Sequence, residues 1–207
     1  MILQTVLLLL LVILSIVFIV FQIRASRSFA PWVPSSLGLL RQILTTINPS
    51  PGSSFIDLGS GDGRAVFLAA EKFNLSATGV ELSPVMWLIS RLRLVISPQK
   101  KNITLLCGDF YKTNLSAFSI IYCYGVPRTI NHSLLTKIRQ EAVPSSWIIS
   151  YNFSFTDLTP AIELRDKWRT IRAYKLWASL YGRFMNRPNI YSENSLLNDH
   201  WPSPMLA

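Results

Sequence analysis

Three acidic side chains and a run of glycines are the residues of this sequence whose types and spacing best suit binding of a nucleotide-like ligand. Residues 55–64 read Phe-Ile-Asp-Leu-Gly-Ser-Gly-Asp-Gly-Arg. Because glycine has no side chain, such a turn lets the backbone approach a ligand closely. Asp57 precedes the turn, Glu81 ends the next apolar run, and Asp109 follows the run after that. The order predicts a ligand site at the ends of three successive strands.

The details of this site favour S-adenosylmethionine over a nicotinamide dinucleotide. The dinucleotide fingerprint Gly-x-Gly-x-x-Gly wants Gly or Ala where this chain has Arg64. Asp57 could order the turn or accept from a cationic amino acid moiety, and Glu81 could bind both hydroxyls of a ribose. Asp109 could accept from an adenine amino group, and the Phe110 ring could lie against the adenine face. The predicted cofactor-binding residues are Asp57, Gly59, Ser60, Gly61, Gly63, Glu81, Asp109 and Phe110.

The chain around these residues alternates between strand and helix patterns. Strands are predicted at 54–58, 77–82, 103–107, 119–124 and 147–152, and helices at 37–47, 65–73 and 129–142. A further helix begins after Ser83, with Pro84 at its first position and Leu88, Leu92 and Val95 on one face. Strands that are apolar on both sides predict a doubly wound α/β fold with a mostly parallel sheet. In the tail, 169–177 and 189–192 could pair as an antiparallel hairpin.

The start of the chain is a long apolar run without a charged residue from Met1 to Ile23. As a helix it would span about 35 Å, enough for a hydrocarbon core of about 30 Å. A cleaved signal peptide would need a basic start and a shorter apolar stretch, so an uncleaved transmembrane helix is the favoured interpretation. Arg24 and Arg27 follow at once, which predicts a single-pass membrane protein with its catalytic domain on the cytoplasmic side.

These patterns divide the chain into four parts. They are a transmembrane anchor (1–23), a linker with an amphipathic helix (24–52), a methyltransferase domain (53–194) and a C-terminal tail (195–207).

The formal net charge of +9 lies wholly after residue 23. The basic stretch 163–187 could face lipid or an acidic partner, or be an ordinary solvated surface. With two cysteines and two histidines, and no CxxC spacing, no metal site is expected, and Cys107 and Cys123 are predicted to be buried.

The three binding segments together resemble a known enzyme family. Phe55 to Arg64, Gly79 to Pro84 and Gly108 to Phe110 are similar to the donor-binding motifs of seven-beta-strand (class I) methyltransferases. Pro31 to Ser36 and Tyr124 to Pro127 narrow the resemblance to membrane-anchored protein lysine methyltransferases. These include mitochondrial enzymes that act on the ATP synthase c subunit and the adenine nucleotide translocase, and archaeal broad-specificity relatives.

The resemblance implies a Rossmann-like class I fold with a seven-stranded sheet and transfer of methyl groups to lysine side chains of proteins. It places Trp32 and Tyr124 near the transfer site, as the predicted catalytic residues. Trp32 departs from relatives that have Tyr there. The loop from Tyr124 to Pro127 lacks the Asp or Asn that base-methylating enzymes use, so no nucleic acid partner is expected. A methyltransferase acting on a lipid or small amphiphile, a donor-binding assembly factor without catalysis, and, more distantly, a nicotinamide-dependent reductase are the alternatives.

Overall fold

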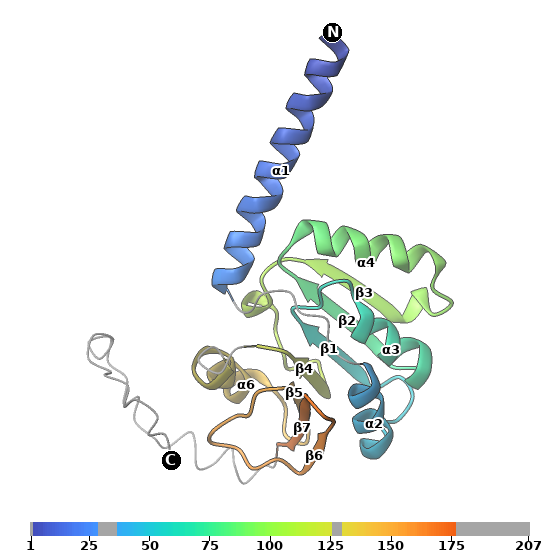
Figure 1. Ribbon diagram of the computed structural model, residues 1–207. Helices are drawn as coiled ribbons and strands as arrows, with labels where there is room; N and C mark the ends of the chain where they lie inside the picture. The colour runs from blue at the N-terminus through green and yellow to red at the C-terminus, as the bar shows by residue number, and fades with distance from the viewer. Residues whose placement is uncertain (1, 29–36, 126–129, 177–207) are drawn as a thin grey trace, which may run out of the picture.

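The strands of this chain form one seven-stranded sheet in the order β3-β2-β1-β4-β5-β7-β6 (Figure 1). The computed structural model describes residues 2–28, 37–125 and 130–176. Strands β1 to β5 pair in parallel, and β7 pairs antiparallel with both β5 and β6. The strands are β1 (Ser54–Leu58), β2 (Ser76–Glu81), β3 (Ile103–Cys107), β4 (Ile120–Cys123), β5 (Trp147–Tyr151), β6 (Ile162–Arg165) and β7 (Thr170–Lys175).

Helices precede or connect these strands. The α-helices are α1 (Ile2–Ser28), α2 (Leu37–Ile47), α3 (Arg64–Phe73), α4 (Pro84–Ile96) and α6 (Leu135–Glu141). Two short 3-10 helices, η1 (Lys100–Asn102) and η2 (Phe110–Lys112), flank β3, and a π-helical turn, η3 (Ile130–Leu134), leads into α6. The five parallel strands and their connecting helices confirm the predicted α/β architecture.

Two apolar clusters cover the two faces of the sheet. On β1, Phe55 belongs to one cluster and Ile56 and Leu58 belong to the other, because successive side chains of a strand point to opposite faces. The first cluster holds the buried side chains of α2 and α3, and the second holds Leu134, Leu135 and Ile138 from η3 and α6. Helices therefore pack on both faces, as a doubly wound sheet requires.

The C-terminal hairpin differs from the prediction. The segment predicted at 169–177 does contain a strand, β7, but β5 and β6 lie along its two edges. The predicted partner, 189–192, lies outside the described residues, and the sequence prediction missed β6. The pattern of β6 is weak because this four-residue strand alternates half-buried and exposed side chains at the edge of the sheet.

Helix α1 projects away from the sheet (Figure 1). Its described side chains, at positions 3–16, 18 and 19, are exposed, and nearly all of them are apolar. A span across a membrane was expected here. Among the described residues, no helix is long and apolar enough to cross a membrane, so the structure does not support that expectation.

The apolar face that the sequence predicts on α4 is exposed at the surface instead of packing against the sheet. Leu88, Leu92 and Val95 do share one face, but they are 54%, 65% and 72% exposed. The inward side carries Trp87, Ser90 and Leu94 instead. Periodicity identifies an apolar stripe without saying which way it faces.

The prediction for the cysteines is half right. Cys123 on β4 is buried, whereas Cys107 at the end of β3 is exposed. Cys107 is the last residue of β3, the edge strand of the sheet, which has a neighbouring strand on one side alone.

Candidate cofactor site

The glycine loop after β1 lies where the chain order of the sheet reverses. From β1 the sheet continues to β2 on one side and to β4 on the other, and ligands of open parallel sheets bind at such a point, outside the carboxyl ends of the strands. The backbone of Gly59, Gly61 and Gly63 has positive φ angles of 87°, 55° and 78°. Residues with a Cβ adopt this region only at a cost, so the loop shape depends on glycine. Gly63 then leads directly into α3.

Glu81, the last residue of β2, braces this loop. Its Oε2 accepts a hydrogen bond from the backbone N–H of Gly61 at 2.7 Å, and its Oε1 accepts one from the backbone N–H of Ser83 at 2.8 Å. Ser83 is the N-cap of α4, as the sequence predicted. One carboxylate therefore joins the glycine loop to the start of α4. A carboxylate can accept about four hydrogen bonds, so two backbone donors leave acceptor capacity for a ligand.

Asp57 lies one strand away from Glu81, at the level of Gly79 in β2. Its side chain is buried, at 5% exposure. Burial, then the charges of Glu81 and Asp62, raise the pKa of Asp57 well above its ordinary value. Burial makes the charged form of a carboxyl costly. A cationic ligand group would relieve this cost.

The neighbouring Asp62 is already compensated. Arg64 donates from Nε to Oδ1 at 2.9 Å and from Nη2 to Oδ2 at 2.7 Å. Burial opposes ionisation of Asp62, but the hydrogen bonds from Arg64 outweigh it and lower its pKa. The negative charge that faces the loop therefore comes mainly from Asp57 and Glu81.

Asp109 and Phe110 stand beyond the end of β3. Asp109 caps η2, since its Oδ1 accepts from the backbone N–H of Tyr111 at 2.9 Å. The Phe110 ring is buried in the core against Tyr111, with ring centroids 4.4 Å apart. Their contacts with adenine stay predictions. Gly108 is tied to the site by its N–H, which donates to the Glu81 carbonyl at 2.9 Å.

Tyr124 lies at the end of β4 with two aromatic neighbours from β5 and the loop after it. Its ring meets Tyr151 edge-on at 5.7 Å and stacks on Phe153 at 6.0 Å between centroids. Tyr124 is half-buried, whereas Tyr122 is buried and stacks on Phe55, as expected of a core residue. Trp32 and the segment 126–129 lie outside the described residues.

The sequence placed Gly79 in a donor-binding motif without a structural role, and it missed Tyr151 and Phe153. A Cβ on Gly79 would lie 2.8 Å from the Ser60 Oγ and 2.9 Å from Val66 Cγ2. Ser60 is itself buried, so Gly79 lets the loop pack on β2. Tyr151 and Phe153 were missed because their apolar pattern is that of any buried strand.

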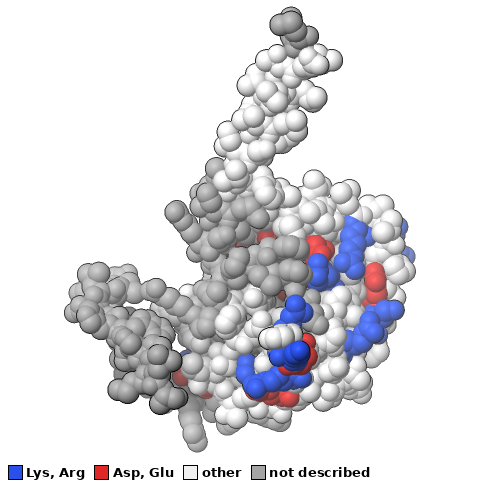
Figure 2. Space-filling view, viewed as in Figure 1, with Lys and Arg blue, Asp and Glu red and all other residues white. Residues whose placement is uncertain are grey.

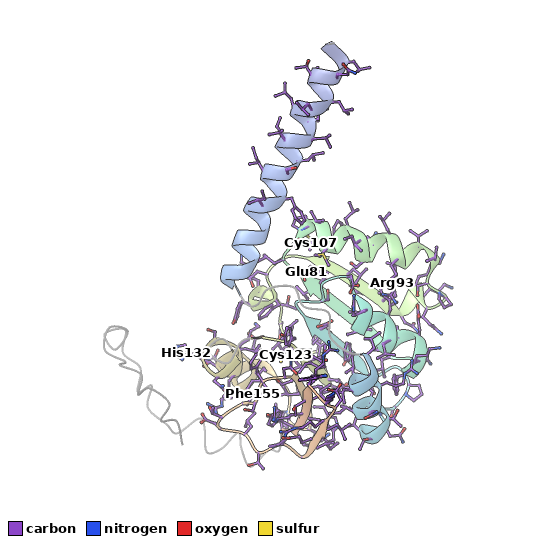
Figure 3. The ribbon with its side chains drawn as sticks, in the orientation of Figure 1. Glu81, Arg93, Cys107, Cys123, His132 and Phe155 are labelled. Atoms are coloured by element: carbon purple, nitrogen blue, oxygen red, sulfur yellow. The ribbon has the colours of Figure 1, made fainter. Side chains whose placement is uncertain are left out.

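Cys107, Cys123 and His132 do not form a reactive cluster. Burial raises the pKa of Cys123 to about 12, and burial, then the charge of Glu81, raises the pKa of Cys107. Figure 3 shows Cys107 beside Glu81 and His132 away from both. Within the described ranges, no three potential ligands gather as a metal site would need. The expected absence of a metal stays a prediction.

A mostly parallel sheet of this order with β7 antiparallel, a glycine loop after β1, and carboxylates on β1 and at the end of β2 are the features of a class I methyltransferase domain. Comparison with known proteins gives the family. The model of the ANTKMT methyltransferase domain matches residues 57–162, which is 106 of the 207 residues. The chain belongs to this family.

Individual relatives agree with this assignment. The chain is 29% identical to the human lysine N-methyltransferase of the ATP synthase c subunit over 144 residues, which cover 70% of this chain and 60% of the human protein. It is 26% identical to a protein-lysine N-methyltransferase of Saccharolobus islandicus over 136 residues, covering 63% and 81%. The match thus spans less than two thirds of the human relative.

A solved structure shows the same fold. An RNA methyltransferase from Salinibacter ruber, in complex with S-adenosyl-L-homocysteine, superposes with a TM-score of 0.67 at 20% identity, over 70% of this chain and 95% of that one. At this identity the likeness concerns the fold alone. With the family established, the cofactor is S-adenosylmethionine. The residues present fit this cation, because the buried carboxyl of Asp57 and the carboxylate of Glu81 lie beside the glycine loop.

Proposed function

We propose that this chain is an S-adenosylmethionine-dependent methyltransferase that modifies lysine side chains of proteins. The observation that carries the proposal is the family match over residues 57–162, together with relatives named as lysine methyltransferases in human and in an archaeon. The geometry supports the proposal: Glu81 accepts from the Gly61 N–H of the glycine loop, and Tyr124 directly follows Cys123, which pairs with Leu58 just before that loop.

We further propose which part of the cofactor each predicted residue binds. Asp57 would face the cationic amino acid part, and Glu81 the ribose hydroxyls. The loop Gly59, Ser60, Gly61 and Gly63 would pass close to the ligand, and Asp109 and Phe110 would hold the adenine. The support for Asp57 is its buried carboxyl with raised pKa, and the support for Glu81 is its acceptor capacity beyond the two loop bonds.

The chemistry at the acceptor requires a lysine amine that has lost its proton. S-adenosylmethionine supplies a methyl group that its sulfonium already activates, so the protein mainly has to hold a neutral amine in line with it. A free lysine amine has a pKa of about 10.4 and loses its proton more easily when it is desolvated. We propose that Tyr124, with Tyr151 and Phe153 behind it, forms one wall of the lysine channel and that Trp32 contributes to another. Aromatic faces would also stabilise the cationic groups.

The test is a transfer assay with the full chain, methyl-labelled donor and extracted membrane proteins. We expect label in protein, recovered as methyl-lysine after acid hydrolysis. The matched inactive variant is Glu81→Gln, and Glu163→Gln on the distant β6 is the control that keeps activity. Label recovered in the lipid extract, or donor binding without any transfer, would overturn the proposal and point to a lipid methyltransferase or a non-catalytic factor.

We propose, in addition, that the N-terminal region anchors the domain to a membrane as a single-pass helix with the domain on the cytoplasmic side. The sequence from Met1 to Ile23 contains no charged residue, and Arg24 and Arg27 follow it. Basic residues flanking an apolar run favour the cytoplasmic side. Retention of the chain in membranes after alkaline carbonate extraction would support the anchor. Release by carbonate, or protease protection of the domain in sealed cytoplasm-outside vesicles, would contradict it.

A further inference from the structure

The outward side of α4 carries an uninterrupted arc of apolar residues, and the exposed Arg91 and Arg93 lie at its borders. Its residues follow helical spacing and are Val85, Leu88, Ile89, Leu92, Val95 and Ile96, all exposed, with Ile96 at 84%. At about 100° per residue they occupy an arc of about 120° on one side of the helix. Figure 3 shows side chains projecting from this side of α4 away from the sheet. We call this arc the α4 apolar face.

Residues on the inner side of α4 contact the rest of the domain. These contacts hold the helix in an orientation that keeps its apolar face outward. The Trp87 indole N–H donates to the Leu105 carbonyl of β3 at 3.1 Å. Ser90 is buried, and its Cβ lies 3.1 Å from where a Cβ on Gly63 would be. The helix therefore packs against β3 and the glycine loop through these two residues.

Basic residues border the α4 apolar face. By helical spacing Arg91 and Arg93 lie on its two sides; the Arg91 guanidinium lies over the Trp87 ring and that of Arg93 over Phe67. Lys100 and Lys101 follow in η1, and the sequence 82–107 contains no Asp or Glu. Figure 2 shows this side as an uncharged surface with basic groups along its border. Each basic residue close to an anionic membrane adds up to about fivefold in affinity.

We propose that the α4 apolar face rests in the interfacial layer of an anionic lipid bilayer, with Arg91, Arg93, Lys100 and Lys101 at the headgroups. An apolar arc bordered by Arg and Lys is the composition of helices that lie in the membrane plane. Figure 1 shows α4 running across the side of the domain from which α1 projects. The inference is separate from methyl transfer, and it adds a second contact to the proposed anchor.

This contact would determine which lysines can reach the site. The start of α4 is held by Glu81 through the Ser83 N–H, so a membrane against α4 fixes the cofactor site close to the headgroup layer. The substrate class would then be lysines of membrane proteins at the bilayer boundary. This last step rests on the proposed lysine methylation.

The test places an environment-sensitive fluorophore on the full chain. Cys107→Ser removes the exposed thiol, and Leu92→Cys carries the label on the α4 apolar face. Gln140→Cys, exposed on α6 against the opposite face of the sheet, is the matched control. The probe is vesicles of phosphatidylcholine and phosphatidylserine with nitroxide groups on the acyl chains. At position 92 we expect a blue shift and loss of most of the fluorescence by quenching, and at position 140 no change. Omitting phosphatidylserine should reduce the quenching at 92.

The outcomes separate the proposals. A chain that sediments with the vesicles while the label at 92 stays unquenched overturns the α4 contact and leaves the anchor and methyl transfer intact. A blue shift at 92 without quenching, growing with the density of protein in the vesicles, also overturns it and means that a second copy covers the face. A chain that does not sediment with the vesicles overturns both membrane proposals. Methyl transfer is measured independently on soluble lysine peptides.

Discussion

Replacing Glu81 by Gln changes one atom of a carboxylate that holds two backbone donors at once. The Gly61 N–H and the Ser83 N–H each donate to a separate oxygen, at 2.7 Å and 2.8 Å. A glutamine has only one acceptor oxygen, so its amide NH₂ must face the second backbone N–H. The variant Glu81→Gln therefore loses one charge-assisted hydrogen bond and weakens the other, while side-chain volume is kept.

The expected magnitudes divide between folding and ligand binding. The two backbone contacts exist without a ligand, so the loss of one and the weakening of the other lower the free energy of unfolding by about 1.5–3 kcal/mol. For a chain of this size Tm falls by about 2–4 °C for each kcal/mol. The contacts to ribose hydroxyls form only with donor bound, so their loss raises Kd. One hydrogen bond to a charged group, about 1.5–3 kcal/mol, corresponds to about 10- to 150-fold in Kd.

The assay pairs thermal melting of the ligand-free chain with calorimetric titration of S-adenosylmethionine, both at neutral pH. Glu163→Gln is the control, because it removes a surface contact to Arg172 that contributes little. A lower Tm with an unchanged Kd would mean that Glu81 only braces the loop. That result would refute its assignment as a cofactor ligand.

Three further substitutions test the rest of the site. Asp57→Asn should stabilise the ligand-free fold and weaken donor binding. The folded-state pKa of Asp57 is raised above 3.8, so the wild type loses stability as pH rises above that value while the variant does not; melts across pH check this. Gly79→Ala should cost about 1–3 kcal/mol in chemical denaturation, because its Cβ would press on Ser60 at 2.8 Å, whereas Gly108→Ala, with open space around it, should not. Tyr124→Ala should lower kcat with little change in donor Kd; an unchanged kcat in the transfer assay would exclude it from the lysine channel.

The sequence was sufficient for the elements that bring the carboxylates together. Ser83 and Pro84 mark the start of α4, and the glycines at 59, 61 and 63 all have the positive φ angles that their pattern implies. Among the parallel strands, β1, β4 and β5 have the strongest signals because both of their faces are buried. Each boundary of these strands is within one residue of its predicted position.

The features that the sequence did not predict depend on contacts between residues that are distant in the chain. The direction of the α4 stripe is decided by Trp87 and Ser90, whose partners, Leu105 and Gly63, are distant in sequence. Gly79 needs no special φ, and its role follows only from the close approach of Ser60. The exposure of Cys107 follows from the strand order, which places β3 at the edge.

The same helix serves the cofactor site and the surface proposed to meet lipid. Its first turn is held by Glu81, its inner side by the glycine loop, and its outer side is apolar. A soluble enzyme of this fold would gain nothing from exposing six apolar side chains, since exposed apolar patches invite association. An enzyme whose lysine substrates lie at a membrane boundary gains from it, because the apolar face orients the domain with its cofactor site at the depth of the substrate. On the proposed membrane contact, the exposed stripe would connect the position of α4 in the fold to the choice of substrate.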